Sequence, residues 1–268
     1  MMDINARYGL EFNPFLKNSK EILFESSEFK ETLFRLDYLA RTKGFGLLTG
    51  APGRGKTTAV RTWASKLNPS LFKVVYTSFS TLTVNDFYRN LAYELGASPA
   101  YRKAENFHAI QAEITRLTVE KRKTPVIIID EVDHISSAVL NDLKMLFNFE
   151  MDSRDRAVIL LVGLPQINNT LKLTVHEPLR QRIIMNYTID GLSKEEGREY
   201  ISGKLSGAGC HQTIFDESAL EAILNAADGT ARMISRFCNS AMVIGNSLGE
   251  TVISAETVRQ AINDSTIV

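Results

Sequence analysis

The 268-residue sequence predicts an α/β protein, in which a parallel sheet covered by helices on both faces is followed by a small all-helical domain. Three observations predict this fold class. Apolar runs of strand length alternate with helical patterns up to residue 190, as in βαβ units. A glycine-rich turn joins the first of these runs to a helix. From Gly191 onward only helical periodicity remains. We therefore expect two domains, at residues 1–190 and 191–268.

The first domain is expected to hold five strands, each a short apolar run bounded by turn residues. They are expected at residues 45–49, 74–77, 126–129, 157–162 and 183–189. Several of these runs are apolar without alternation, so both faces of the sheet should be buried. Helices with apolar residues every three or four positions separate the strands. They are expected at residues 27–42, 58–67, 85–95, 105–121, 137–149 and 166–173.

Other segments are placed by their turn and capping residues. Residues 1–25 fit neither period and are expected to be irregular, with a fixed turn at Asn13-Pro14-Phe15. Thr83 or Asn85 is expected to cap the helix over 85–95, and Gly96 to end it. In the second domain, glycine-rich or capping residues separate four expected helices. These cover residues 194–206, 216–227, 231–248 and 255–264.

The composition is that of an ordinary globular protein, with 44% hydrophobic and 23% charged residues. No apolar run approaches the roughly 20 residues of a membrane-spanning helix, and the acidic N-terminus is unlike a signal peptide. The two cysteines are widely spaced, and the four histidines lack the spacing of metal ligands. We therefore expect a cytoplasmic protein without a structural metal and without a membrane partner.

The formal net charge is zero, but it is unevenly distributed. Residues 191–268 hold six Lys or Arg and ten Asp or Glu, a net charge of −4, which leaves +4 on residues 1–190. An excess of this size is compatible with a nucleic-acid surface on the first domain. Ordinary solvated surface charge is the simpler explanation.

The glycine-rich turn fits the pattern G-x-x-x-x-G-K-[ST] without a mismatch, between an apolar strand and a helix. In such a loop the backbone N–H groups and the helix N-terminus bind phosphate. Lys56 would reach the β- and γ-phosphates, and Thr57 would place its hydroxyl on Mg²⁺. The pattern predicts binding of ATP with Mg²⁺. The residues expected to hold the nucleotide here are Gly50, Ala51, Pro52, Gly53, Arg54, Gly55, Lys56, Thr57 and Thr58.

A pair of acids ends the expected buried strand at residues 126–129. Asp130, at the strand end, suits a Mg²⁺ contact beside Thr57. Glu131 is placed to polarise the water that attacks the γ-phosphate. Taken alone, two acids at a strand end could simply face solvent. Beside a phosphate-binding loop they predict hydrolysis of ATP to ADP and phosphate.

The order of motifs resembles the AAA+ ATPases, and more narrowly the ExeA/TniB-like group, which includes transposition regulators of the TnsC and MuB kind. The resemblance covers nearly the whole chain and implies a P-loop NTPase αβα sandwich followed by a helical lid. The segments that carry it are Tyr8-Gly9-Leu10, Asn13-Pro14-Phe15, residues 44–57, Ile129-Asp130-Glu131, residues 160–165, residues 179–183 and residues 229–234.

The resemblance assigns roles to three sets of residues. Arg182 resembles the arginine finger that reaches the γ-phosphate of a neighbouring subunit, with Arg180 as the second candidate; without the family, both would be taken as solvated surface residues. Arg232 resembles the sensor 2 arginine of the lid, with Arg236 as its alternative. Pro14 and Phe15 are expected to lie against the adenine, although aromatic residues here could equally pack in the core.

One position departs from the family pattern. The strand ending at Val162 should deliver a polar residue that orients the attacking water, but the sequence continues Gly163-Leu164-Pro165. The side chain of Leu164 cannot orient water. Gln166 and Asn168 are the nearest polar alternatives. We therefore expect slow hydrolysis.

In the transposition regulators, residues after the second strand follow the duplex backbone. The matching candidates here are Thr83, Arg102 and Lys103, with Lys121-Arg122-Lys123 in reserve. Each could instead be an ordinary solvated surface residue. Contacts of this kind give affinity from phosphates, strong salt dependence and little reading of bases.

These observations predict an ATP-dependent DNA-binding AAA+ ATPase that oligomerises on double-stranded DNA as a ring or helical filament and regulates transposition with a separately encoded transposase. The first alternative is an ExeA-like ATPase of secretion-pathway assembly. Such proteins continue into a membrane span and a cell-wall-binding region, which this sequence lacks, so we expect the transposition role. The second alternative is a scaffold gated by ATP that scarcely hydrolyses it.

Overall fold

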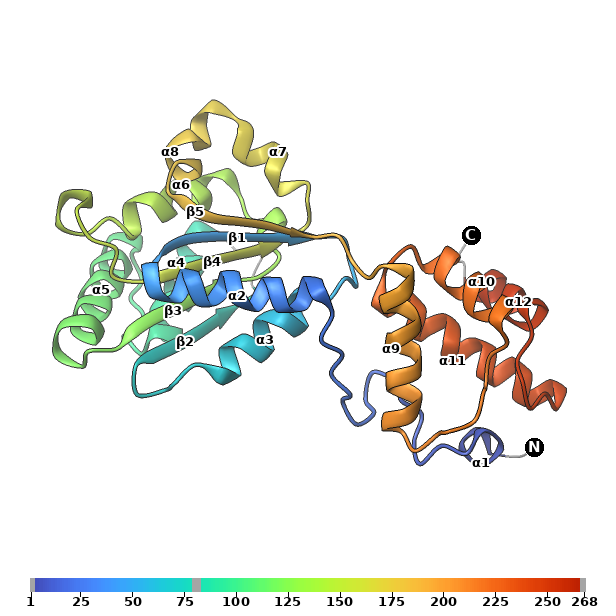
Figure 1. Ribbon diagram of the computed structural model, residues 1–268. Helices are drawn as coiled ribbons and strands as arrows, with labels where there is room; N and C mark the ends of the chain where they lie inside the picture. The colour runs from blue at the N-terminus through green and yellow to red at the C-terminus, as the bar shows by residue number, and fades with distance from the viewer. Residues whose placement is uncertain (1–2, 79–82, 266–268) are drawn as a thin grey trace. The chain divides into compact units, whose positions relative to one another are not determined.

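The computed structural model of the protein describes residues 3–78 and 83–265, and these form two compact units (Figure 1). The α/β unit contains residues 31–51 and 56–189. The helical unit contains the described residues of 1–30 and 190–268, together with residues 52–55. This division differs from the expected one at residues 1–190 and 191–268, because the N-terminal residues pack in the helical unit.

The α/β unit is built on five parallel strands in the order β2-β3-β4-β1-β5. Their bounds are β1 Gly44–Gly50, β2 Phe72–Thr77, β3 Thr124–Ile129, β4 Val158–Gly163 and β5 Ile183–Ile189. Every residue of β1 and β4 is buried, as their apolar sequences predict. Since β4 lies between β1 and β3, the segments that leave β1, β3 and β4 meet at one edge of the sheet.

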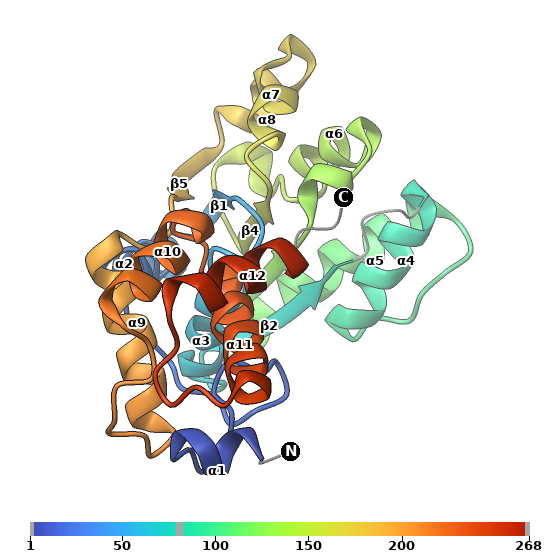
Figure 2. The same ribbon diagram turned by 90° about the vertical axis from the view of Figure 1, so that its right-hand side faces the viewer.

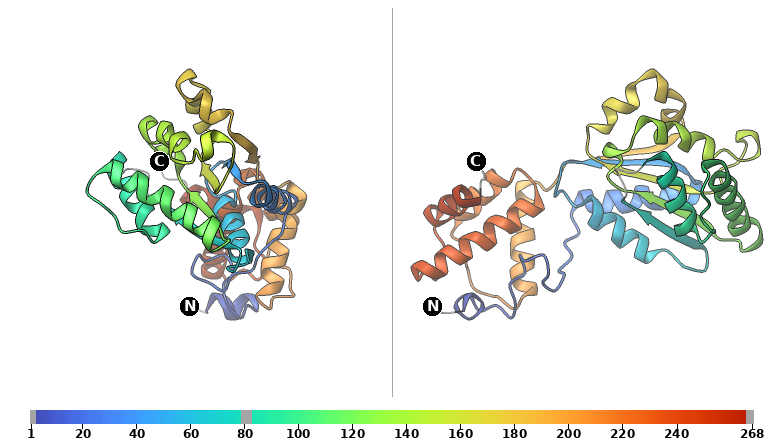
Figure 3. Two further views of the ribbon diagram at one scale, coloured as in Figure 1. Left: turned by 90° about the vertical axis from the view of Figure 1, so that its left-hand side faces the viewer. Right: turned by 180° about the vertical axis from the view of Figure 1, so that it is seen from behind.

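Alternate residues of each central strand pack on opposite faces of the sheet. On one face Leu48 and Leu160 pack with Trp63, under helices α2 (Ser27–Thr42) and α3 (Lys56–Lys66). On the other face Phe45 and Leu161 pack under helices that the reverse view brings to the front (Figure 3). Those helices include α4 (Val84–Leu95), α5 (Lys103–Thr115) and α6 (Ser137–Leu146), and two short helices, α7 (Ile167–Lys172) and α8 (Glu177–Arg180), follow β4. The expected αβα sandwich is confirmed.

The helical unit is centred on α11 (Ala231–Leu248), which packs against four other helices (Figure 2). These are α1 (Ile4–Tyr8), α9 (Lys194–Gly207), α10 (Glu217–Ala227) and α12 (Ala255–Ser265). The bounds of α9–α12 agree with the expected helices to within one residue at either end. The expectation of an irregular N-terminus is wrong at α1, which ends at Tyr8 and is capped by Gly9 with a left-handed φ of 64°. Tyr8, Leu10 and Phe15 are buried in the core of this unit, which explains why the N-terminal residues belong to it.

Two helices of the α/β unit end earlier than their periodicity predicts. The expected helix 105–121 stops at Thr115 and continues as a π-helical turn over Arg116–Glu120. The expected helix 137–149 stops at Leu146. Short 3-10 turns also occur at Val132–His134, Glu150–Asp152 and Thr174–His176.

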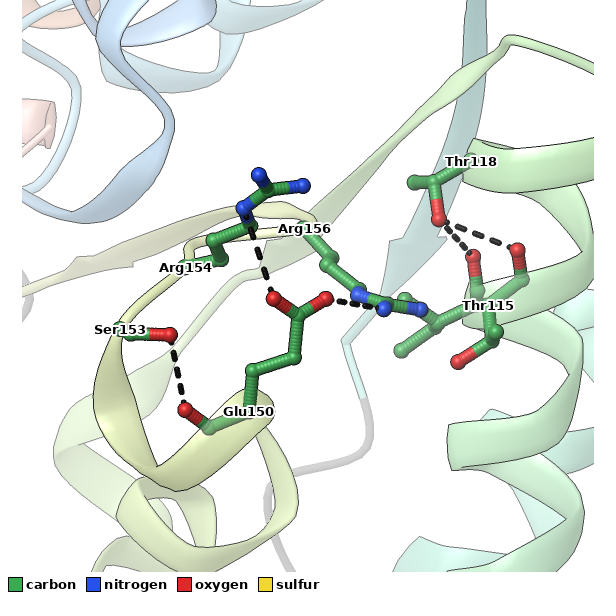
Figure 4. Close-up of polar contacts among 7 residues, drawn as sticks. Thr115, Thr118, Glu150, Ser153, Arg154 and Arg156 are labelled. Carbon is green, nitrogen blue, oxygen red and sulfur yellow. Dashed lines mark hydrogen bonds and ion pairs between the residues drawn. The ribbon is translucent and has the colours of Figure 1, made fainter.

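The segment between α6 and β4 contains two consecutive left-handed residues that are not glycine, Glu150 at φ 51° and Met151 at φ 55°. Such backbone is strained, so the surrounding contacts must hold it. The carboxylate of Glu150 pairs with Arg154 at 3.4 Å and with Arg156, and Ser153 Oγ donates to the Glu150 carbonyl at 2.8 Å (Figure 4). The hydrogen bond from Arg156 lowers the pKa of Glu150. Met151, at the tip, is fully exposed.

Candidate nucleotide-binding site

The phosphate-binding loop runs from the end of β1 at Gly50 to the start of α3 at Lys56. Two positions of the loop favour glycine, because Gly53 and Gly55 have left-handed φ values of 78° and 96°, which residues with a side chain rarely adopt. A Cβ at Gly53 would also lie 2.8 Å from the Cβ of Arg232. The loop therefore has the turn that directs backbone N–H groups at a phosphate, at the N-terminus of an 11-residue helix.

The Lys56 ammonium is folded back over the loop, where Nζ donates to the carbonyls of Gly50 (2.7 Å) and Ala51 (3.1 Å). Thr57 and Thr58 follow in the first turn of α3. Within the helical unit, Arg54 donates to the backbone oxygen and the carboxylate of Asp228, at 3.2 and 3.3 Å. The Lys56 ammonium thus lies at the loop, and its contact with the β- and γ-phosphates stays a prediction, while Arg54 is engaged by an acid.

Asp130 and Thr57, the two predicted magnesium ligands, lie together although they are 73 residues apart in the sequence. Thr57 Oγ1 is 3.5 Å from Asp130 Oδ2, which is long for a hydrogen bond and leaves both oxygens available to one cation, directly or through water. The described residues contain no group of three or more His, Cys, Asp or Glu that could hold a metal. Mg²⁺ bound with a nucleotide needs only one or two protein oxygens, so the residues present fit it.

Asp130 is only 8% exposed, and both of its carboxylate oxygens accept a protein hydrogen bond. The Glu131 N–H donates to Oδ1 at 2.9 Å, and the Tyr76 hydroxyl donates to Oδ2 at 2.9 Å. Burial, the hydrogen bond to Asp130 and the negative charges of Asp130 and Glu131 raise the pKa of Tyr76 to about 12. The hydroxyl therefore stays protonated and remains a donor at neutral pH. Sequence reasoning misses Tyr76, because its partner lies on the neighbouring strand.

Glu131 follows Asp130 with a left-handed backbone, at φ 55° and ψ 37°. This region is unfavourable for a residue with a side chain, and strained residues concentrate at functional sites. The side chain of Glu131 is exposed, and it follows Asp130 directly in the chain. Its role in polarising the attacking water stays a prediction.

The carboxylate of Asp133 lies against Gly163, at the end of β4. This is where the sequence lacks the polar residue that the family pattern leads us to expect. The Asp133 side chain is 2% exposed, and Oδ1 accepts the N–H of Leu164 at 2.8 Å. A Cβ on Gly163 would lie 2.7 Å from that oxygen, so the glycine admits the carboxylate. Asp133 Oδ2 accepts the Gln166 side-chain N–H at 3.2 Å. Asp133 thereby ties Gln166, and not the more distant Asn168, to the segment that carries the acid pair.

The two candidate finger arginines lie at the opposite edge of the sheet from the phosphate-binding loop. Gly50 pairs with Ile189 at the end of β5, whereas Arg182 precedes the start of β5. A seven-residue strand is about 20 Å long, so these arginines do not reach their own loop. Arg182 Nη1 donates to the Lys144 carbonyl at 2.6 Å, and Arg180 Nη1 to the Lys172 carbonyl at 3.2 Å.

The remaining nucleotide candidates belong to the helical unit. Arg232 is exposed in the first turn of α11, and its backbone N–H donates to the carbonyl of Gly53 at 3.3 Å. Arg236 instead donates to the Ser265 carbonyl at 2.6 Å. Pro14 and Phe15 are buried, and Phe15, at 7% exposure, packs in the core of the unit. Their contact with adenine stays a prediction.

The structure brings two of the three DNA candidates together at neighbouring helix starts. Thr83 caps α4, because its hydroxyl accepts from the Asp86 N–H at 3.3 Å. Arg102 is the N-cap residue of α5, and its neighbour Tyr101 is 85% exposed. The Asn85 amide donates to the Tyr101 carbonyl at 3.1 Å and so joins the two helix starts.

The other basic candidates differ from this pair. Lys103 Nζ is 2.5 Å from Asp142 Oδ2 and 5.3 Å from the ring centre of Tyr88, so an acid compensates its charge. Lys121-Arg122-Lys123 precedes β3 at the amino-terminal edge of the sheet. These three residues lie at the far end of β3 from Asp130, away from the magnesium ligands. No helix within the described ranges has the length and apolarity to cross a membrane.

Known proteins resemble this chain in sequence and in fold. The AAA domain family matches residues 39–171. General secretion pathway protein A of Aeromonas hydrophila is 30% identical over 249 residues, which are 90% of this chain and 45% of that protein. ATP-dependent target DNA activator B of Escherichia phage Mu is 28% identical over 123 residues, 46% of this chain and 37% of that protein.

The chain thus spans less than half the length of either curated relative. Among solved structures, Cdc6p from Pyrobaculum aerophilum superposes with a TM-score of 0.70 and 17% identity, over 95% of this chain and 72% of that one. A likeness at this level of identity concerns the fold alone.

Proposed function

The chain belongs to the AAA+ family of P-loop nucleoside triphosphatases, in the group of ExeA-like and MuB-like proteins, and on this premise we propose that it is an ATP-dependent DNA-binding ATPase that assembles on duplex DNA and regulates transposition. The observation that carries the proposal is the placement of Thr57 within 3.5 Å of Asp130, with Glu131 beside them and the phosphate-binding loop adjacent. This arrangement would hold the phosphates and the cation beside a carboxylate suited to activating water.

In the proposed reaction, the loop amides and Lys56 hold the β- and γ-phosphates. Mg²⁺, held through Thr57 and Asp130, would neutralise charge on the phosphate oxygens. Glu131 draws a proton from the attacking water, and Gln166 orients that water. Among the described residues, the side chain of Gln166 makes one hydrogen bond, at 3.2 Å to Asp133, and it lies on an exposed segment after β4. A loosely held orienting residue favours slow hydrolysis.

Assembly would complete the site, because neither Arg182 nor Arg180 lies near the phosphate-binding loop of its own chain. Arg182, with Arg180 as second candidate, would approach the γ-phosphate bound by a neighbouring copy. An arginine in trans stabilises the charge of the leaving phosphoryl group. Hydrolysis would then depend on assembly, and the nucleotide state would control disassembly.

The exposed surface at Thr83, Tyr101 and Arg102 is proposed to contact the duplex backbone. One phosphate contact per copy is weak, but repetition along a ring or filament multiplies it. The similarity to the phage protein, an ATP-dependent target DNA activator, supports contact with DNA. In the proposed role, the assembly marks target DNA in the cytoplasm and stimulates a separately encoded transposase.

A secretion-pathway role is the second candidate, and one observation favours it. The similarity to General secretion pathway protein A extends over 90% of this chain, against 46% for the phage protein. In that role the same ATP site would drive assembly of an envelope complex. The two proposals agree on ATP and differ on DNA.

A binding experiment with duplex DNA separates them. The full chain is titrated into labelled duplex with ATP, ADP or no nucleotide, at several salt concentrations, and the complexes are imaged by electron microscopy. We expect ATP-dependent rings or filaments whose affinity falls steeply with salt. Lys56→Ala is the control that should not assemble. ATP binding without any DNA binding at low salt would favour the secretion role, and tight ATP binding without turnover would favour a scaffold.

A further inference from the structure

Tyr76 lies next to the last residue of β2, on the strand that borders β3. It pairs with Ile128, and Thr77 pairs with Ile129. The ladder continues one step beyond β3, because the N–H of Asp130 donates to the Thr77 carbonyl at 2.8 Å. The strand pairing therefore holds the Tyr76 side chain beside the carboxylate of Asp130.

The direction of the Tyr76 hydroxyl is informative. The side chain is 47% exposed, and a half-exposed tyrosine can direct its hydroxyl to water at little cost. Here the hydroxyl instead donates at 2.9 Å to Oδ2 of the 8%-exposed Asp130. Thr57 Oγ1 lies 3.5 Å from the same oxygen. The tyrosine thus contacts the oxygen that faces the other predicted magnesium ligand.

Two donors from different elements fix the plane of this carboxylate. The Glu131 N–H holds Oδ1 at 2.9 Å, and Tyr76 holds Oδ2 at 2.9 Å. With the Tyr76 hydroxyl removed, the backbone N–H would remain on Oδ1 and only the long 3.5 Å contact from Thr57 on Oδ2, so the carboxylate could rotate more freely about its terminal bond. Groups that hydrogen-bond a ligating carboxylate commonly set both its orientation and its affinity for metal.

Resting on the proposed magnesium–nucleotide site, we propose that Tyr76 is a positioning residue that holds Asp130 in the orientation required for Mg²⁺. Its contribution is confined to the cation. The loop amides and Lys56 hold the phosphates independently of Tyr76, so ATP binding in the absence of Mg²⁺ does not depend on its hydroxyl. This separation distinguishes a positioning role from a general effect on folding.

The test uses the full chain carrying Tyr76→Phe, which removes only the hydroxyl. The affinity for a fluorescent ATP analogue is measured in EDTA, and Mg²⁺ is then titrated into the protein–nucleotide complex. Mn²⁺ binding, followed by electron paramagnetic resonance, gives a second reading without turnover. We expect the half-saturating cation concentration to rise about 10-fold, with the affinity in EDTA unchanged.

Tyr93→Phe is the matched control, because Tyr93 is 68% exposed on α4 and loses the same atom. Thermal unfolding verifies that each variant is folded. An unchanged cation requirement in Tyr76→Phe, or an equal loss of affinity with and without the cation, would overturn the inference. Wild-type protein that binds no Mg²⁺–ATP would instead refute the proposed function itself, so the two failures are distinguishable.

Discussion

The two edges of the central sheet carry opposite chemistry. The carboxyl-terminal edge holds the phosphate-binding loop, the acids Asp130 and Asp133 and the strained Glu131. Basic residues gather at the amino-terminal edge, before β3, β4 and β5. The first edge assembles a nearly complete nucleotide site from one chain. The second carries the two candidate finger arginines, which lie about the length of a strand away from the loop of their own chain. This difference is the basis of the proposal that catalysis is divided between copies.

The largest expected effect tests this division. Arg182→Ala should lower ATP turnover about 1,000-fold, because the transition-state charge loses its partner in trans. Arg180→Ala should have the smaller effect if Arg182 is the finger. Turnover is measured under conditions in which the protein assembles. Mixing Arg182→Ala with Glu131→Gln, which still binds ATP, provides the control, because each junction that pairs an intact Glu131 with an intact finger regains activity, to about one quarter of wild type in an equal mixture. Mixtures that stay inactive would place the finger elsewhere.

Glu131→Gln should lower turnover about 100-fold or more, since amide nitrogen and oxygen cannot accept the proton of the attacking water. Binding of ATP should remain, so the variant should stay on DNA as a long-lived assembly. Stopped-flow release of phosphate and the dissociation rate from labelled duplex give the two readings. Equal dissociation rates for variant and wild type would show that hydrolysis does not drive release.

Lys56→Ala should weaken ATP binding about 100-fold, because the phosphates lose a charged partner at the loop. Isothermal titration calorimetry with ATP measures the affinity directly. Lys66→Ala, at the other end of α3, removes the same charge away from the loop and serves as the control. Comparable loss in the two variants would contradict the assignment of the carboxyl-terminal edge as the phosphate site.

Gln166→Ala should lower turnover about 10-fold without changing the affinity for ATP, as expected for a residue that only orients water. Asn168→Ala, two positions later, should leave turnover close to wild type. Steady-state kinetics on the assembled protein compare the two. A larger effect of Asn168→Ala would exchange the two roles.

The smallest expected effect is on the affinity for duplex DNA. Arg102→Ala should weaken duplex binding a few-fold and reduce the salt slope by about one per copy, because one phosphate contact is lost. Lys103→Ala should change the slope less, since Asp142 already compensates that charge at 2.5 Å. Fluorescence anisotropy over a salt series provides the slopes. If Lys103→Ala changed the salt slope more than Arg102→Ala, Lys103 would be the phosphate contact, and its ion pair with Asp142 would have to open on DNA.

Sequence predicts the strands and long helices well where burial repeats regularly. The expected helix over 27–42 and the expected strand over 183–189 coincide with α2 and β5. In α2 the apolar residues recur every three or four positions, and in β5 burial alternates from one residue to the next. The short helix α1 escapes prediction, since five residues are too few for a period and packing of Tyr8 stabilises it. The end of helix α6 also escapes, because the strained turn at Glu150 depends on Arg154 and Arg156.

The residues of the candidate site also differ in how far the sequence predicts them. Lys56, Thr57, Asp130 and Glu131 are predictable because a local motif fixes each of them. Asp133 and Tyr76 are not, since their roles depend on which strands are neighbours. The order β2-β3-β4 puts Tyr76 on one side of Asp130, and the end of β4 beside Asp133. A run of three acids around residues 130–133 is the only sequence signal that points to Asp133.

The full exposure of Met151, compared with the burial of both cysteines, makes this position suitable for attaching a label. The only two cysteines of the chain, Cys210 and Cys238, are both buried, and burial raises the pKa of the Cys238 thiol. Met151→Cys would therefore introduce a single thiol open to maleimide dyes. A fluorophore attached there, at the sheet edge away from the nucleotide, would report the joining of neighbouring copies by energy transfer in real time.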